Sequence, residues 1–191
     1  MHGVIGVDEV GRGCLAGPLL VVAARGTADL PDGLRDSKLL TRQQRENIFA
    51  SLAACCSFGE GWVSAAEIDK KGLASALRLG LDRALRAVNA AFDEEIIYDG
   101  PVNYAPGNFK KVQCLIDADE LIPLVSAASI YAKVKRDQFM IELKKKFPKY
   151  GFENHVGYST RKHRTAIEQY GPIELVHRMS FAPFRQIELQ L

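Results

Sequence analysis

The chain has 191 residues, a formal net charge of +2, and is 47% hydrophobic and 25% charged. This balance is typical of one compact globular domain and excludes a disordered tail protein and a polycation. No apolar run approaches the ~18 residues of a membrane-spanning helix, and no secretory leader pattern precedes the first predicted strand, so we expect a cytoplasmic protein without a membrane partner.

The four cysteines are predicted to be structural. Cys14, Cys55, Cys56 and Cys114 form no C-x-x-C pair that would indicate a zinc site. Four thiols in a chain of this size are typical of a reducing compartment. We expect each thiol to fill core space as a small apolar side chain.

The predicted elements, in chain order, mix short apolar strands with longer amphipathic helices. Strands are expected at residues 3–7, 19–24, 58–64, 95–98 and 112–116. Helices are expected at 41–54 with Thr41 as N-cap, across 65–88, at 123–146, and at 160–169 with Thr160 as N-cap. Glycine and proline indicate loops at 11–18 and 148–157. The pattern predicts an α/β protein.

Carboxylates stand where three of these strands end: Asp8 with Glu9, Asp99, and Asp117 with Asp119. Ligands of open α/β sheets bind beyond the strand ends, so these acids can converge on one point. Like charges held together repel, and a divalent cation relieves that repulsion; oxygen ligands favour Mg²⁺ or Mn²⁺ over zinc. Two such ions ~3.5–4 Å apart suit phosphodiester hydrolysis. The alternative is that these acids only end strands in turns, and Asp117 is the weakest of the set.

The loop at residues 11–17 reads GRGCLAG, which invites comparison with a dinucleotide-binding fingerprint. That fingerprint needs a helix opening at the glycines, whereas Pro18 and residues 19–24 predict a strand. The neighbouring Asp8 and Glu9 would also repel a pyrophosphate. We therefore favour a loop whose bare backbone approaches a substrate, where amide and carbonyl groups can hydrogen-bond a ribose 2′-OH.

Basic residues gather in the C-terminal half, and they form either a phosphate-binding flank or a solvated face. They are Lys133, Lys135, Arg136, Lys144, Lys145, Lys146, Lys149, Arg161, Lys162 and Arg164. We expect Asp137 to be a helix ion-pair partner and His163 to be a surface or capping residue. His155, His163 and His177 lack metal-ligand spacing. Taken alone, Lys38 and Tyr158 would be an ordinary surface lysine and a loop aromatic.

Several blocks, in order over residues 3–184, resemble the bacterial type of the ribonuclease HII family. The two most specific are DEVGRG at 8–13 and SAASIYAKVKRD at 126–137. Weaker matches are LAGP at 15–18, RDSKLLT at 35–41, IYDG at 97–100, AD at 118–119, GYST at 157–160 with His163, and HRMSF at 177–181. Three positions depart from the family pattern: Cys14 stands where proline is usual, Ala118 where glycine is common, and residues 68–73 lack an asparagine. No carboxylate is missing.

The resemblance implies a ribonuclease H-like mixed sheet flanked by helices over residues 1–147. Residues 148–191 would be a helical extension packed on it within one compact unit. It also implies a monomeric endonuclease that uses Mg²⁺ or Mn²⁺ to hydrolyse the RNA strand of RNA–DNA hybrids and to incise DNA 5′ of embedded ribonucleotides, leaving 3′-OH and 5′-phosphate ends. The catalytic, metal-binding residues would be Asp8, Glu9, Asp99 and Asp119, and the substrate-binding residues would be Gly11, Arg12, Gly13, Lys38 and Tyr158.

Two other classes of function stay open on the residues alone. A non-catalytic nucleic-acid-binding protein on the same fold is disfavoured by the intact carboxylates. A nucleotide-binding oxidoreductase is disfavoured by Pro18 and the strand predicted after it. Cleavage of a labelled RNA–DNA hybrid with Mg²⁺, with and without chelator, separates the first class from both others.

Overall fold

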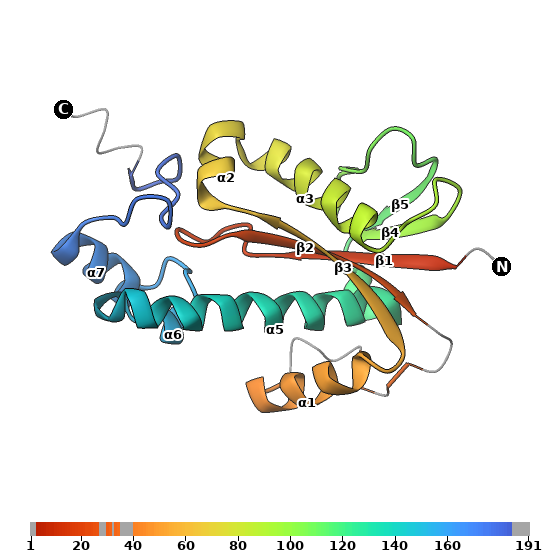
Figure 1. Ribbon diagram of the computed structural model, residues 1–191, viewed down its shortest axis with the longest axis horizontal. Helices are drawn as coiled ribbons and strands as arrows, with labels where there is room; N and C mark the ends of the chain where they lie inside the picture. The colour runs from red at the N-terminus through yellow and green to blue at the C-terminus, as the bar shows by residue number, and fades with distance from the viewer. Residues whose placement is uncertain (1–2, 27–29, 32, 35–39, 185–191) are drawn as a thin grey trace.

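The computed structural model describes residues 3–26, 30–31, 33–34 and 40–184. Its five-stranded sheet has the order β3-β2-β1-β4-β5 (Figure 1). Strand β1 pairs antiparallel with β2 and parallel with β4; β2–β3 is antiparallel and β4–β5 parallel. The sheet is therefore mixed. The strands are β1 Val4–Val10, β2 Leu19–Gly26, β3 Cys56–Val63, β4 Glu95–Asp99 and β5 Lys111–Leu115.

Helices cover both faces of this sheet. Helix α3 packs on one face against β2 and β3, and the long helix α5 crosses the other face against β1 and β2 (Figure 1). The helices are α1 Arg42–Leu52, α2 Ala65–Lys71, α3 Leu73–Ala87, α4 Ala118–Leu121, α5 Pro123–Lys146, the 3-10 helix η2 Pro148–Tyr150, α6 Phe152–His155 and α7 Arg161–Tyr170.

The continuous apolar run of β2 follows from burial on both faces, because alternate side chains point in opposite directions. Leu19, Val21 and Ala23 join the core under α3. Leu20, Val22 and Ala24 pack against Ala128 and Ala132 of α5. The central strands are thereby held rigidly, so the side chains at their ends have fixed positions.

Most predicted elements are confirmed, and three differ. Strand β1 runs on to Val10, so Asp8 and Glu9 lie inside it, paired with Val22 and Val21 of β2. The predicted helix across 65–88 is two helices that meet at Gly72. The predicted loop at 148–157 contains η2 and α6. Thr41 and Thr160 both cap helices as predicted.

The segment from Pro148 to Phe184 packs at the C-terminal end of α5. Its core contains Tyr150, Phe152 and Ala166, which contact Ala16 of the glycine loop and Met140 of α5. The four cysteines are free, and Cys14 is fully buried. Within the described ranges, no helix combines the length and apolarity that a membrane crossing requires.

Candidate active site

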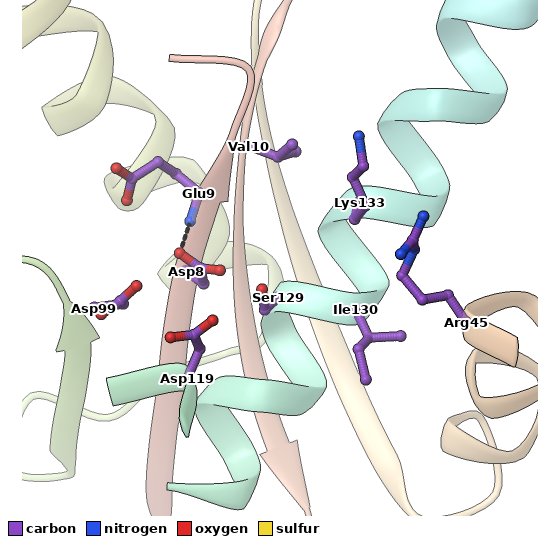
Figure 2. Close-up of a pocket in the computed structure, with 9 residues that line it drawn as sticks. All are labelled: Asp8, Glu9, Val10, Arg45, Asp99, Asp119, Ser129, Ile130 and Lys133. Carbon is purple, nitrogen blue, oxygen red and sulfur yellow. Dashed lines mark hydrogen bonds between the residues drawn. The ribbon is translucent and has the colours of Figure 1, made fainter. Parts of the chain in front are cut away.

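Four acids from three elements line one open pocket of about 440 Å³. Asp8 and Glu9 come from β1, Asp99 from the end of the parallel neighbour β4, and Asp119 from α4 (Figure 2). The register places Val7 beside Tyr98, so Asp8 and Asp99 follow side by side. The convergence expected from the strand ends is what the structure shows for these four residues.

Hydrogen bonds hold these carboxylates in place. An Asp8 oxygen accepts from the Glu9 amide at 2.7 Å, and the Tyr98 hydroxyl donates to Glu9 Oε2 at 2.5 Å. Asp99 Oδ1 accepts from the amide of Ala118 at 2.9 Å, which ties β4 to the start of α4. The Asp119 main-chain carbonyl accepts from the hydroxyl of Ser126. The site is thus built before any ligand enters it.

Burial makes the negative charge at this site costly. Burial raises the pKa of Asp8 from 3.8 to about 8, and repulsion from Glu9 and Asp99 adds to it, although a hydrogen bond from Ser129 opposes the rise. Burial likewise raises the pKa of Glu9, against hydrogen bonding by Tyr98 and the charge of Arg12. Carboxyl groups in this state favour a cation among them. Their hard oxygen atoms fit Mg²⁺ or Mn²⁺.

A second acidic group shares one member with the pocket. One oxygen each of Asp117, Asp119 and Glu120 lies within 4.8 Å of the others. Asp117 and Glu120 are exposed, as the prediction of Asp117 as a surface acid requires. Exposed acids at this spacing are common without an ion. The pocket acids fit a metal ion better, because two of them, Asp8 and Asp119, are buried, and because the paired strands β1 and β4 and helix α4 bring all four together.

Two cations face the acids across the pocket. Lys133 from α5 and Arg45 from α1 lie on the opposite wall, and Ser129 lies between (Figure 2). Lys133 is ion-paired with Asp137 at 3.0 Å, which confirms the predicted role of Asp137. This arrangement suits a phosphodiester substrate, because its negative charge can interact with a cation held by the acids on one side and with Lys133 and Arg45 on the other.

The glycine loop adjoins the acids at the end of β1. Gly11 has φ +87°, and a side chain there would collide with the Arg136 guanidinium. The Arg12 carbonyl accepts from Arg178 Nη1 at 3.0 Å. The dinucleotide alternative fails because strand β2, and not a helix, follows the loop.

Tyr158 lies beside this loop, from the other end of the sequence. The Gly157 carbonyl accepts from the Leu15 amide at 2.9 Å, which joins the two segments. The Tyr158 side chain is 39% exposed, and Lys133 Nζ lies 5.4 Å from its ring centroid. Lys133, which lines the acidic pocket, thus links that pocket to Tyr158. Lys38 falls outside the described residues.

Residues 5–184 match the family model for ribonuclease HII. The chain belongs to the ribonuclease HII family. The ribonuclease HII of Sinorhizobium medicae is 42% identical over 96% of this chain and 84% of its own length. A structure of ribonuclease H2 from Pyrococcus horikoshii has 30% identity and a TM-score of 0.78, covering 98% of this chain and 97% of that one. The ribonuclease HII of Archaeoglobus fulgidus, solved with PCNA, has 27% identity and a TM-score of 0.73, covering 92% and 93%.

This family makes the chain an endoribonuclease of the ribonuclease H type. The structure adds pocket residues that the sequence does not single out. Ser129 and Arg45 line the pocket, and Tyr98 holds Glu9. The SAASIYAKVKRD block could have indicated Ser129, because Ser129 and Lys133 are one helical turn apart. Nothing local marks Arg45.

The structure corrects two predictions about single side chains. Arg136 is predicted among the phosphate-facing residues, but it is fully buried and donates to the carbonyls of Ala16, Pro18 and Val156. His163 is predicted to be a surface or capping residue; its side chain is fully buried, so the surface role is wrong, while its amide donates to the Thr160 cap. Both side chains face inward because segments distant in the sequence close over them.

Several of the remaining basic residues have acidic partners or lie in a hollow of their own. Lys144 is paired with Glu153 at 3.1 Å and Lys145 with Glu142 at 2.6 Å. Lys149, Arg161 and Lys162 line a separate hollow on α7. The choice between a phosphate-binding flank and a solvated face is therefore a matter for measurement.

Proposed function

We propose that this ribonuclease hydrolyses the RNA strand of RNA–DNA hybrids with the help of divalent metal ions, and incises DNA 5′ of embedded ribonucleotides. The products would carry 3′-OH and 5′-phosphate ends. The observation that carries the proposal is the convergence of four carboxylates from β1, β4 and α4 in one pocket beside the glycine loop. Such a site is suited to phosphoryl chemistry.

Asp8, Glu9, Asp99 and Asp119 would hold Mg²⁺ or Mn²⁺. When bound, the ions would neutralise these carboxylates and stabilise charge that develops at the scissile phosphate. The protein's own residues do the rest. Tyr98 and Ser129 orient Glu9 and Asp8, and the Lys133 ammonium attracts the substrate backbone to the opposite wall.

Recognition of the ribose would fall to the glycine loop and Tyr158. Backbone groups of Gly11, Arg12 and Gly13 can reach a 2′-OH, because the glycines carry no side chain. The exposed Tyr158 ring would lie against the neighbouring deoxyribose, where a second 2′-OH would crowd it. Lys38 would bind a phosphate.

The chain would act as a cytoplasmic monomer. Residues 1–147 would form the catalytic domain, and residues 148–191 a helical extension within the same compact unit. Packing of Tyr150 and Phe152 against Ala16 and Met140 supports the single compact unit, since it brings the part of the chain that contains Tyr158 onto the catalytic domain.

The proposal is tested with two labelled substrates: an RNA–DNA hybrid and a DNA duplex with one ribonucleotide, each with Mg²⁺ or with EDTA. We expect cleavage of both with metal and of neither with chelator, with the duplex cut 5′ of the ribonucleotide. A 2′,3′-cyclic phosphate product would show that the ribose hydroxyl is the nucleophile and would refute metal-assisted hydrolysis. Tight binding without cleavage would indicate the non-catalytic alternative.

A further inference from the structure

Three of the chain's four histidines form a buried stack directly behind Tyr158. The rings of His155 and His163 lie 4.2 Å apart at an interplanar angle of 16°. The Nε2 atoms of His163 and His177 lie 3.2 Å apart. The ring of Phe152 contacts all three imidazoles. The stack lies apart from the acidic pocket, and the proposed chemistry makes no use of it.

The hydrogen bonds of the stack fix which nitrogen of each ring carries a proton. The Ile173 amide can only donate, and it points at His177 Nδ1 at 2.8 Å, so neutral His177 carries its proton on Nε2. That proton faces His163 Nε2, which must therefore accept. His163 then carries its proton on Nδ1, which donates to the Tyr158 carbonyl at 2.9 Å.

The third ring follows the same logic. The Gly157 amide donates to His155 Nδ1 at 3.2 Å, so the His155 proton is on Nε2 and is given to the Tyr150 carbonyl at 2.9 Å. Every ring nitrogen of the stack thus has one partner. An added proton would set two N–H groups against each other. Burial agrees, since it lowers the pKa of His163 and of His177 to about 4.

Two histidines of the stack hydrogen-bond the main chain of Tyr158. The Tyr158 amide donates to the His155 carbonyl at 2.9 Å, and the Tyr158 carbonyl accepts from His163 Nδ1 and from the Thr160 amide at 2.8 Å. The side chain is 39% exposed; its hydroxyl is within hydrogen-bonding reach of the Cys14 thiol, and Lys133 and Arg136 lie 5.4 and 6.0 Å from the ring centroid. These contacts act on the ring, whereas the main chain that carries the ring is held by the histidines.

We propose that His163 and His177 are positioning residues for Tyr158. His177 fixes the tautomer of His163, and His163 holds the Tyr158 carbonyl. The main chain then places the Tyr158 ring where it can contact the sugar next to the ribonucleotide. This inference rests on the proposed junction-sensing function of Tyr158. It adds a selectivity determinant far from the carboxylates. Its consequence is that the histidines govern the choice between substrates and leave the hydrolytic rate on a long hybrid nearly unchanged.

Two amide variants separate the two bonds of His163. In His163→Asn the side-chain NH₂ occupies the place of Nδ1–H and still donates to the Tyr158 carbonyl. In His163→Gln the side-chain amide reaches the place of Nε2, so it can still hydrogen-bond His177, but the hydrogen bond to the Tyr158 carbonyl is lost. Both variants lose the same ring stacking, which makes each the control of the other for folding and packing.

The readout is the ratio of kcat/KM on the single-ribonucleotide duplex to kcat/KM on the hybrid, measured below both melting midpoints. Removal of one hydrogen bond corresponds to a roughly five- to tenfold change, so we expect His163→Gln to lower the ratio by about that factor and His163→Asn to stay within about twofold of the original chain. Equal ratios in the two variants, whether lowered or unchanged, would overturn the proposal.

NMR provides a test that does not depend on cleavage. We expect ¹⁵N shifts to show a protonated Nδ1 in His163 and a protonated Nε2 in His177, and the Tyr158 carbonyl ¹³C shift to move in His163→Gln and not in His163→Asn. The opposite tautomers, or equal carbonyl shifts, would overturn the positioning role. If these shifts agree but Tyr158→Ala leaves the cleavage ratio unchanged, then junction sensing by Tyr158 fails and the selectivity role falls with it.

Discussion

Neutralising Asp8 should stabilise the metal-free protein, although it removes a residue proposed to be essential for catalysis. Asp8 is buried beside Glu9 and Asp99, and its carboxyl group is protonated more readily than in water. Below its raised pKa the folded protein must hold a proton that the unfolded chain has released, and above that pKa it must hold a buried charge that the unfolded chain would hold in solvent. In Asp8→Asn the charge is absent and the shape is retained, so this cost disappears.

The size of the effect follows from the pKa of Asp8, about 8 in the folded state against 3.8 for the unperturbed side chain. Between these values the folded state retains a proton that the unfolded state has released. The stability from this group is therefore complete at low pH and is lost as the pH rises towards 8. One pH unit corresponds to about 1.4 kcal/mol, so the loss from pH 5 to pH 8 is about 4 kcal/mol.

The assay is thermal unfolding of both proteins in EDTA at pH 5, 6, 7 and 8. We expect the Tm of Asp8→Asn minus that of the original chain to grow by about 10 °C towards pH 8. His163 and His177 have pKa values lowered from 6.5 to about 4, so they make the folded protein less stable as the pH falls. This contribution is the same in both proteins and cancels when their Tm values are subtracted. Asp117→Asn, at an exposed carboxyl group, is the control. A difference that stays constant with pH would refute the reasoning, and saturating Mg²⁺ should stabilise the original chain more than the variant.

Three further predictions concern activity and affinity. Asp99→Asn should lower kcat/KM on the hybrid by at least ~100-fold with Mg²⁺ while binding measured by anisotropy persists, and near-normal cleavage would remove Asp99 from the catalytic set. Tyr158→Ala should impair cleavage at a single ribonucleotide far more than cleavage of a long hybrid, with Tyr158→Phe milder; equal effects on both substrates would contradict junction sensing. Replacing Lys144, Lys145 and Lys146 together by Ala should reduce the salt slope of log K by about 0.9 for each phosphate that these lysines neutralise, and an unchanged slope would identify a solvated face.

The strands of the sheet could be predicted from the sequence because local composition marks them. The run from Leu19 to Ala24 has to be buried on both faces, and it is. The proximity of Asp8 and Asp99 could be predicted because strand ends share one edge of a sheet. The sequence could not predict that Asp8 and Glu9 lie within β1. Their pairing with Val22 and Val21 of β2 is a long-range interaction, and it extends the strand past its apolar part.

What the sequence could not show depends on packing between distant segments. Arg136 and Arg178 carry the same charge as their exposed neighbours, and nothing local distinguishes a phosphate ligand from a buried donor. All of their acceptors but one are carbonyls of the glycine loop and Pro18, more than a hundred residues away; the exception is the Val156 carbonyl, 20 residues from Arg136. The histidines near Tyr158 likewise show no metal spacing, and their stack arises only when α7 and the segment around His177 pack together.

The buried guanidinium of Arg136 leads to a last prediction about the glycine loop. Its Nε, Nη1 and Nη2 donate to the carbonyls of Pro18, Val156 and Ala16 at 2.8, 2.9 and 3.1 Å. One planar fork thereby ties the loop to the residues that precede Tyr158. Arg136→Lys keeps the charge, but a compact ammonium cannot reach three carbonyls spread around a guanidinium.

One or two of those buried carbonyls would lose their hydrogen-bond donor, which would lower the free energy of unfolding by about 1–3 kcal/mol for each. We therefore expect Arg136→Lys to lower the Tm by several degrees and to raise KM for the single-ribonucleotide duplex, because the loop and Tyr158 would no longer keep a fixed spacing. Arg164→Lys is the matched control, since exposed Arg164 makes longer hydrogen bonds to Ser159, at 3.3 and 3.5 Å. If the two variants melt and bind alike, the fork does not hold the loop, and the spacing must come from the main-chain bonds between Leu15 and Gly157.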